Sequence, residues 1–169
     1  MGQVVYLGLC LLGCLIFNPR VEGADDDTVT AKSPCPEGAL LFRRNCYEVF
    51  SNALPWRSAE KECQTLEEGA HLVSIQDIQE LRFLSSYLRR QNAGYNVWIG
   101  LHDPVSYRGQ NWAWSSGTPY DPSASFWNGW RPSSYSSLCV AISPSGSSRW
   151  IQRDCSNPFP YVCKYRPFY

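Results

Sequence analysis

Aromatic rings and hydrogen-bonding side chains alternate in one stretch of the chain, between residues 127 and 135. An aromatic ring covers the apolar C–H face of a pyranose, while Arg, Asn and Ser side chains bind its hydroxyls or an anionic substituent. The stretch therefore predicts a saccharide-binding surface. Its candidate residues are Trp127, Asn128, Trp130, Arg131, Ser133, Ser134 and Tyr135.

The supply of catalytic groups argues against an enzyme. Only His71 and His102 are bases that titrate near neutral pH. His71 falls in a predicted strand, where we expect a polar, outward-facing residue. No Gly-x-Ser-x-Gly motif occurs, and every cysteine that follows the leader is expected to be in a disulfide. We predict a non-enzymatic protein without a cofactor.

The composition predicts a small extracellular domain. The chain has 169 residues, of which 44% are hydrophobic and 18% charged, enough apolar material for one core. The formal net charge is zero, so the broad positive field that nucleic-acid binding needs is missing. Eight cysteines in so short a chain suggest disulfides and therefore an oxidising compartment. The oligomeric state is not determined by these features.

The N-terminal part is predicted to be a secretory signal peptide followed by a flexible tail. Residues 1–23 contain an apolar run of fourteen residues, too short to cross a bilayer, and the small residues after it suit signal cleavage after Gly23. Residues 24–33 are acidic and almost free of large apolar side chains, which predicts a flexible tail. Lys32 is a candidate trypsin-type processing site, and an uncut, solvated tail is the favoured alternative. The folded domain is expected to cover residues 34–169.

Periodic segments predict two helices followed by an antiparallel sheet, an α+β class. Apolar residues at Trp56, Ala59, Cys63 and Leu66 mark the first helix. The second covers about 77–90, with Asp77 as N-cap and Ile78, Leu81, Phe83 or Leu84, and Leu88 on its buried face. A hairpin of 39–42 with 46–50 precedes the helices; the later strands are predicted at 96–101, 112–114, 139–142, 150–151 and 161–163. The stretch 115–138 is rich in Ser and Pro and reads as a long irregular loop.

Six cysteines remain once the leader is removed, and six allow fifteen pairings. Cys35 and Cys46 bracket the predicted hairpin, which favours a bond between them. Cys63 lies on the inner face of the first predicted helix and needs a distant partner. The remaining cysteines are Cys139, Cys155 and Cys163.

Five short motifs are spread over the chain: Cys35-Pro36, Asn45-Cys46-Tyr47, Gly69-Ala70-His71-Leu72-Val73-Ser74-Ile75, Trp98-Ile99-Gly100-Leu101-His102-Asp103-Pro104 and Cys163-Lys164-Tyr165. Taken together, these motifs resemble the C-type lectin-like domain, and within it the regenerating (Reg) and lithostathine group. The resemblance extends almost continuously from Cys35 to Cys163 and implies the pairings Cys35–Cys46, Cys63–Cys163 and Cys139–Cys155. It also implies that Trp127 is buried, whereas Trp130 has no counterpart in the family pattern and is the best candidate for an exposed contact.

The family's calcium site is expected to be absent. Sugar-binding members of this family use a Glu-Pro-Asn or Gln-Pro-Asp triplet and a later Asn-Asp pair as oxygen ligands of Ca²⁺. Here the triplet position reads Arg131-Pro132-Ser133, and Ile151-Gln152 replaces the pair. A guanidinium at ligand distance would repel the ion, so we predict no metal. The remaining loop acids, Asp103, Asp121 and Asp154, are expected to be turn or cap residues.

Three functions agree with the resemblance. The first is a secreted lectin-like protein that binds bacterial or host polysaccharide or glycoconjugates without calcium, with antimicrobial activity as a consequence. The second is a growth or repair factor that acts on a cell-surface receptor. The third, a matrix- or mineral-associated protein, ranks last because the only acidic cluster is Asp25–Asp27.

Overall fold

A computed structural model describes residues 33–91, 96–105, 111–133, 136–143 and 149–167. The predicted leader, its cleavage residue Gly23, the tail up to Lys32, and the candidate residues Ser134 and Tyr135 lie outside the described residues. In the described part, no helix has the length and apolar character needed to cross a membrane.

The described chain forms two α-helices and eight strands, which confirms the α+β prediction. Helix α1 is Trp56–Leu66 and helix α2 is Ile78–Arg90, both close to their predicted bounds. A short 3-10 helix, η1, covers Ser125–Trp127 within the long loop. The strands are β1 (Leu40–Phe42), β2 (Asn45–Leu54), β3 (His71–Leu72), β4 (Val97–His102), β5 (Ala113–Trp114), β6 (Cys139–Ser143), β7 (Arg149–Arg153) and β8 (Phe159–Tyr165).

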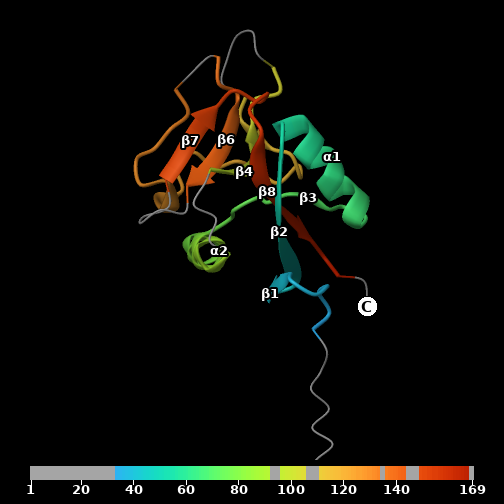
Figure 1. Ribbon diagram of the computed structural model, residues 1–169. Helices are drawn as coiled ribbons and strands as arrows, with labels where there is room; N and C mark the ends of the chain where they lie inside the picture. The colour runs from blue at the N-terminus through green and yellow to red at the C-terminus, as the bar shows by residue number, and fades with distance from the viewer. Residues whose placement is uncertain (1–32, 92–95, 106–110, 134–135, 144–148, 168–169) are drawn as a thin grey trace, which may run out of the picture. The chain divides into compact units, whose positions relative to one another are not determined.

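The strands make one mixed sheet in the order β1-β2-β8-β4-β6-β7, with β3 beside β8 and β5 beside β4 (Figure 1). The pairings are antiparallel except that of β4 with β8, which is parallel at Trp98 and Tyr161. The last strand, β8, therefore lies in the middle of the sheet, beside β2, the second strand of the first hairpin. This arrangement brings the end of the domain next to its beginning.

Side chains that alternate along the central strands pack into two separate hydrophobic cores, one on each face of the sheet. On β4, Ile99 and Leu101 pack with residues of α2, whereas Trp98 packs with residues of α1. The same alternation holds on β8, where Val162 faces the α2 side and Cys163 the α1 side. Each helix thus covers one face of the sheet, as the two-residue period of a strand requires.

Helix α2 begins at the predicted cap. The Asp77 carboxylate accepts hydrogen bonds from the backbone N–H groups of Gln79 and Glu80, both at 2.9 Å. The prediction that Ile78 is buried is wrong, because its side chain is 37% exposed while Leu84 is fully buried. Ile78 is the first residue of α2 and lies at its exposed end, whereas the apolar residues of the following turns, such as Leu81 and Leu84, face the core.

The three disulfides are those that the resemblance implied: Cys35–Cys46, Cys63–Cys163 and Cys139–Cys155. The bond between Cys63 and Cys163 joins α1 to β8 across 100 positions of sequence. It therefore fixes the helix of the N-terminal half to the last strand.

One glycine is required by close packing of three segments. A Cβ on Gly100 would lie 2.7 Å from the carbonyl oxygen of Leu72 and 2.7 Å from the Oγ of Ser115. Gly100 itself receives a hydrogen bond from Ser115 N and donates one to Val73 O. Any side chain here would separate β4 from the segments that carry the loop region.

Candidate functional site

The candidate loop turns sharply after η1. Asn128 and Gly129 both adopt positive φ values, of 51° and 78°, a conformation that Asn and Gly tolerate best. The turn is closed by hydrogen bonds from Asn128 N to Ser125 O and from Trp130 N to Trp127 O. As a result Trp130 folds back onto Trp127 and does not project freely into solvent.

Trp127 is part of the core and not of the surface. Its side chain is 1% exposed and its indole N–H donates to the carbonyl oxygen of Asp121 at 2.8 Å. Its ring centroid lies 4.4 Å from that of Trp150 and 5.5 Å from that of Tyr120. The expectation that Trp127 contacts a ligand is therefore corrected: an enclosed ring has no free face, and its role is to anchor the loop.

Trp130 lies at the edge of this aromatic cluster. It is half-buried, with its ring centroid 5.6 Å from that of Trp127 and 6.2 Å from that of Trp150. Part of the indole thus packs on the core and the rest faces solvent. The residue predicted to be an exposed contact is thus a half-buried ring whose orientation is held by its neighbours.

Arg131 and Ser133 are exposed beside Trp130, as is Asn128. The Arg131 guanidinium donates to the carbonyl oxygen of Trp130 at 2.7 Å. Burial raises the pKa of the half-buried Tyr120, and the positive charge of Arg131 works in the opposite direction, which places the cation near that ring. The surface therefore combines one indole edge, one cation and two neutral hydrogen-bonding side chains.

Gln152 fastens the loop in a way the sequence did not indicate. Its side-chain Oε1 accepts from Ser133 N at 2.6 Å, and its Nε2 donates to Ser137 O at 2.8 Å. In the sequence, Gln152 is notable only as part of the Ile151-Gln152 pair that replaces the family's Asn-Asp ligands. Its position on β7, opposite Val140 of β6, puts it within reach of both loop segments, and this pairing is visible only in the fold.

The three loop acids hold turns, as predicted. Asp121 and Asp154 accept from the backbone N–H and the hydroxyl two residues on, at Ser123 and Ser156, and these bonds are the main reason that the pKa of each carboxyl lies below its ordinary value. Asp103 accepts from Val105 N and is buried. Over the described ranges, no three His, Cys, Asp or Glu side chains converge in a way that could hold a metal ion.

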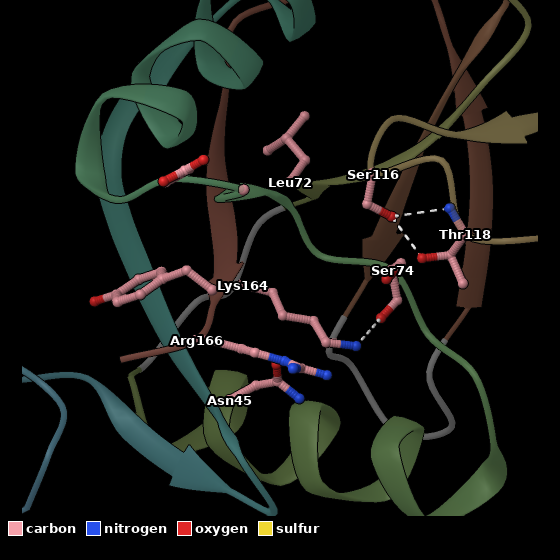
Figure 2. A pocket seen from close by; sticks show the side chains of 10 residues that line it. Asn45, Leu72, Ser74, Ser116, Thr118, Lys164 and Arg166 are labelled. Carbon is pink, nitrogen blue, oxygen red and sulfur yellow. Dashed lines mark hydrogen bonds between the residues drawn. The ribbon is translucent and has the colours of Figure 1, made fainter. Parts of the chain in front are cut away.

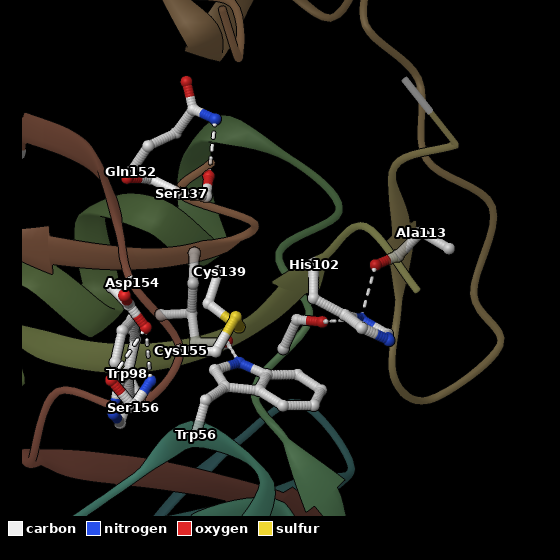
Figure 3. The surroundings of a disulfide bond; sticks show 12 residues. Trp56, Trp98, His102, Ala113, Ser137, Cys139, Gln152, Asp154, Cys155 and Ser156 are labelled. Atoms are coloured by element: carbon white, nitrogen blue, oxygen red, sulfur yellow. Dashed lines mark hydrogen bonds between the residues drawn. A yellow bond between two sulfur atoms is a disulfide. The ribbon is translucent and has the colours of Figure 1, made fainter. Parts of the chain in front are cut away.

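Both histidines have structural partners. His71 Nδ1 lies 2.6 Å from Glu60 Oε1. His102 stacks on Trp56 with ring centroids 4.3 Å apart, and its Nδ1 faces the carbonyl oxygens of Gly100 and Ala113 near the Cys139–Cys155 disulfide (Figure 3). Because carbonyl oxygens only accept, Nδ1 carries the proton. Burial lowers the pKa of His102, which keeps the ring neutral.

A family model described as "Lectin C-type domain" matches residues 52–165. Regenerating islet-derived protein 3-gamma of Rattus norvegicus is 37% identical over 166 residues, an alignment that covers 92% of each chain. The chain belongs to the Reg and lithostathine group of C-type lectin domains. The resemblance inferred from the motifs is thereby confirmed.

Solved structures of C-type lectin domains agree with the fold of this Reg-group chain. Human lithostathine is similar with a TM-score of 0.64 at 32% identity, covering 78% of this chain and 90% of that one. The C-type lectin domain of murine dendritic cell inhibitory receptor 2, solved in complex with an N-glycan, has a TM-score of 0.66 at 30% identity, covering 78% and 98%. The two helices, mixed sheet and three disulfides are those of this lectin fold.

Proposed function

We propose that this Reg-group protein is a secreted, non-enzymatic lectin that binds polysaccharide without calcium, through the exposed parts of Asn128, Trp130, Arg131 and Ser133. Ser134 and Tyr135, which continue the same loop in the sequence, are included in the proposed surface. The observation that carries the proposal is the half-buried Trp130, fixed by Trp127 and Trp150 beside an exposed guanidinium.

The chemistry of the surface suits a sugar ring. A fixed indole edge packs against the C–H face of a pyranose, and the neighbouring guanidinium and hydroxyl supply charge-assisted and neutral hydrogen bonds. The glycan complex of the murine receptor domain supports sugar binding as a property of this fold, at 30% identity. A bacterial polysaccharide as ligand would link binding to antimicrobial activity.

Independence from calcium is supported by what stands at the usual ligand positions. Arg131 brings a full positive charge to the triplet, and a second cation at the same place would be repelled. Gln152, at the later position, uses both ends of its amide on the backbone of Ser133 and Ser137. A calcium ion would have to break this connection to gain one neutral ligand.

Secretion is supported by the predicted leader and by the three disulfides. Disulfides persist in oxidising compartments and are rare in the cytosol. Expression of the full chain in cultured cells would test it: the mature protein is expected in the medium with Ala24 as its N-terminal residue. Retention of the full-length chain in the cell would contradict it.

The deciding experiment is a pull-down of the mature chain on insoluble peptidoglycan and on mannan, with 5 mM calcium or with excess EDTA, concentrations that saturate or remove weak calcium sites. We expect equal binding in the two buffers. Binding that is lost in EDTA would refute calcium independence, and no binding to any polysaccharide in a wider glycan array would refute the lectin function itself.

Variants assign the binding to the loop. Trp130→Ala is expected to weaken binding by about five- to thirtyfold, because the loss of one stacked ring is worth roughly 1–2 kcal/mol. Trp130→Phe keeps a ring on the cluster and should lose less. Arg57→Ala, at an exposed position on α1, is the matched control and should bind as the parent does. Equal loss in Arg57→Ala would show that binding is not at the loop.

A further inference from the structure

A second recess, away from the aromatic loop residues, lies between the end of β8 and the segment after β5. It has a volume of about 350 Å³, within the roughly 300–1,000 Å³ of small-molecule sites. Its lining is polar and comes from five separate parts of the chain. Those residues are Asn45, Glu68, Gly69, Leu72, Ser74, Ser116, Thr118, Lys164, Tyr165 and Arg166.

One wall of the recess carries an ammonium group in a fixed position. Lys164 Nζ donates to Ser74 O at 3.0 Å and to Glu80 Oε1 at 2.5 Å. Glu80 is itself buried and also accepts from Tyr47 Oη and Gln76 N. These contacts hold Lys164 in place and balance its charge, while two of the three ammonium N–H groups are used. The third is left to donate to a ligand.

Arg166 supplies the charge that is not balanced. It is exposed, and among the residues that the structure describes it forms no salt bridge. Figure 2 shows its guanidinium extending beside Asn45 and next to Lys164. Guanidinium groups recognise planar carboxylates through two parallel hydrogen bonds, a geometry that a lysine does not offer.

The opposite wall presents hydroxyl groups. Ser116 Oγ and Thr118 Oγ1 lie 2.8 Å apart and face the two cations across the recess (Figure 2). Among the described residues that line the recess, Tyr165 alone carries a ring; it is buried and donates its hydroxyl to Glu48 at 2.7 Å. A ligand here would be held by charge and hydrogen bonds and not by stacking on a ring.

We propose that this recess binds a saccharide residue bearing a single carboxylate, with the carboxylate on Arg166 and Lys164 and the ring hydroxyls on Ser116 and Thr118. The lining holds one acid, Glu68, against its two cations, and Glu80 already balances Lys164. With Glu80 counted, the site carries no net charge, so it does not balance the several charges of a phosphate or a densely sulfated chain. Arg166, which forms no salt bridge among the described residues, is the cation left for a single carboxylate. None of the residues that line the recess belongs to the loop of the proposed function, so this proposal does not depend on sugar binding by that loop.

The test is a titration of the ¹⁵N-labelled domain with sodium D-glucuronate, followed by backbone amide chemical shifts. Shifts are expected at Ser116, Thr118, Lys164 and Arg166. D-glucose and the methyl ester of glucuronate share the ring but lack the charge, and should bind at least about tenfold more weakly, the value of one charge-assisted hydrogen bond. Equal binding of glucose or of the ester would overturn the proposal.

Two variants locate the carboxylate. Arg166→Gln removes the charge at an exposed position and should weaken glucuronate binding about tenfold or more. Arg57→Gln, the same change on α1, should leave the affinity unaltered. If Arg57→Gln had the same effect, glucuronate would be responding to net charge alone, and the site would be refuted.

Inorganic phosphate and acetate complete the design. Phosphate that shifts these amides more strongly than glucuronate at equal concentration would overturn the carboxylate assignment, and acetate as effective as glucuronate would overturn the role of the hydroxyls. Trp130→Ala should leave glucuronate binding intact. Polysaccharide binding therefore tests the loop and glucuronate binding tests the recess, so the failure of either proposal can be told from the failure of the other.

Discussion

At the scale of single residues, Gln152 decides how well the candidate loop is fixed. Its amide bonds two backbone groups, Ser133 N and Ser137 O, in segments that flank the loop. Gln152→Ala should lower the free energy of unfolding by about 1–2 kcal/mol, because each bond contributes roughly 1 kcal/mol. Urea denaturation measures this loss, and polysaccharide binding should weaken with it because Ser133 loses its tether.

The control for this prediction is another glutamine. The Gln76 side chain is exposed, and Gln76 contacts Glu80 through its backbone N–H. Gln76→Ala should therefore change stability by less than about 0.5 kcal/mol. If both variants lost the same stability, the amide of Gln152 would have no special role.

His102 makes stability depend on pH. Burial lowers its pKa in the folded protein below the unfolded value of about 6.5. As the pH falls below 6.5 the unfolded chain takes up the proton first, so the stability that neutral His102 contributes is complete above that pH and is lost on acidification. His102→Phe keeps the stacking on Trp56 but does not titrate. The unfolding free energy of the parent minus that of the variant should therefore decrease from pH 7 to pH 5. A value that is constant with pH would contradict this account.

At the scale of elements, the helices and strands could be predicted because their signals are local. The spacing of Trp56, Ala59 and Cys63 defines α1, and Asp77 marks the start of α2. The binding surfaces could not be predicted in the same way. Trp130 is half-buried only because the backbone turns back at Asn128, and Gln152 reaches Ser133 across 19 positions of sequence. Such contacts depend on tertiary pairing, which periodicity does not encode.

The start of α2 gives a prediction for an element. Asp77 accepts two backbone hydrogen bonds at the helix terminus and pairs with Arg43 at 2.6 Å. Asp77→Ala should lower the unfolding free energy by about 1–2 kcal/mol, whereas Asp77→Asn keeps the cap and should lose less than about 1 kcal/mol, because the ion pair is exposed. Thermal unfolding at pH 7 distinguishes the two.

The same residue sets an acid limit for α2. The hydrogen bond from Arg43, and then that from the Glu80 backbone, hold the pKa of Asp77 below its ordinary value. A lowered folded pKa means that this stability is present above about pH 4 and is lost as the pH falls through the folded value. The deficit of Asp77→Asn relative to the parent should thus be smaller at pH 3 than at pH 7. A deficit that grows on acidification would show that the carboxylate is not stabilised in the fold.

At the scale of the whole molecule, the disulfides differ in how much chain they constrain. The Cys63–Cys163 bond closes a segment of 100 positions and the Cys35–Cys46 bond one of 11. Loop-closure entropy gives about 4.7 kcal/mol for the first and roughly 2.8 kcal/mol for the second. The double variant Cys63→Ala with Cys163→Ala should therefore lose about 2 kcal/mol more than Cys35→Ala with Cys46→Ala in guanidinium unfolding of the otherwise oxidised domain. Cys63 connects α1 to the central strand β8, and β8 also carries Lys164 in the recess. Loss of this disulfide should therefore weaken the packing of α1 on β8 and make the recess around Lys164 less rigid. If the short-loop variant were the less stable of the two, local packing around the hairpin, and not the constraint on the unfolded chain, would control the stability of this domain.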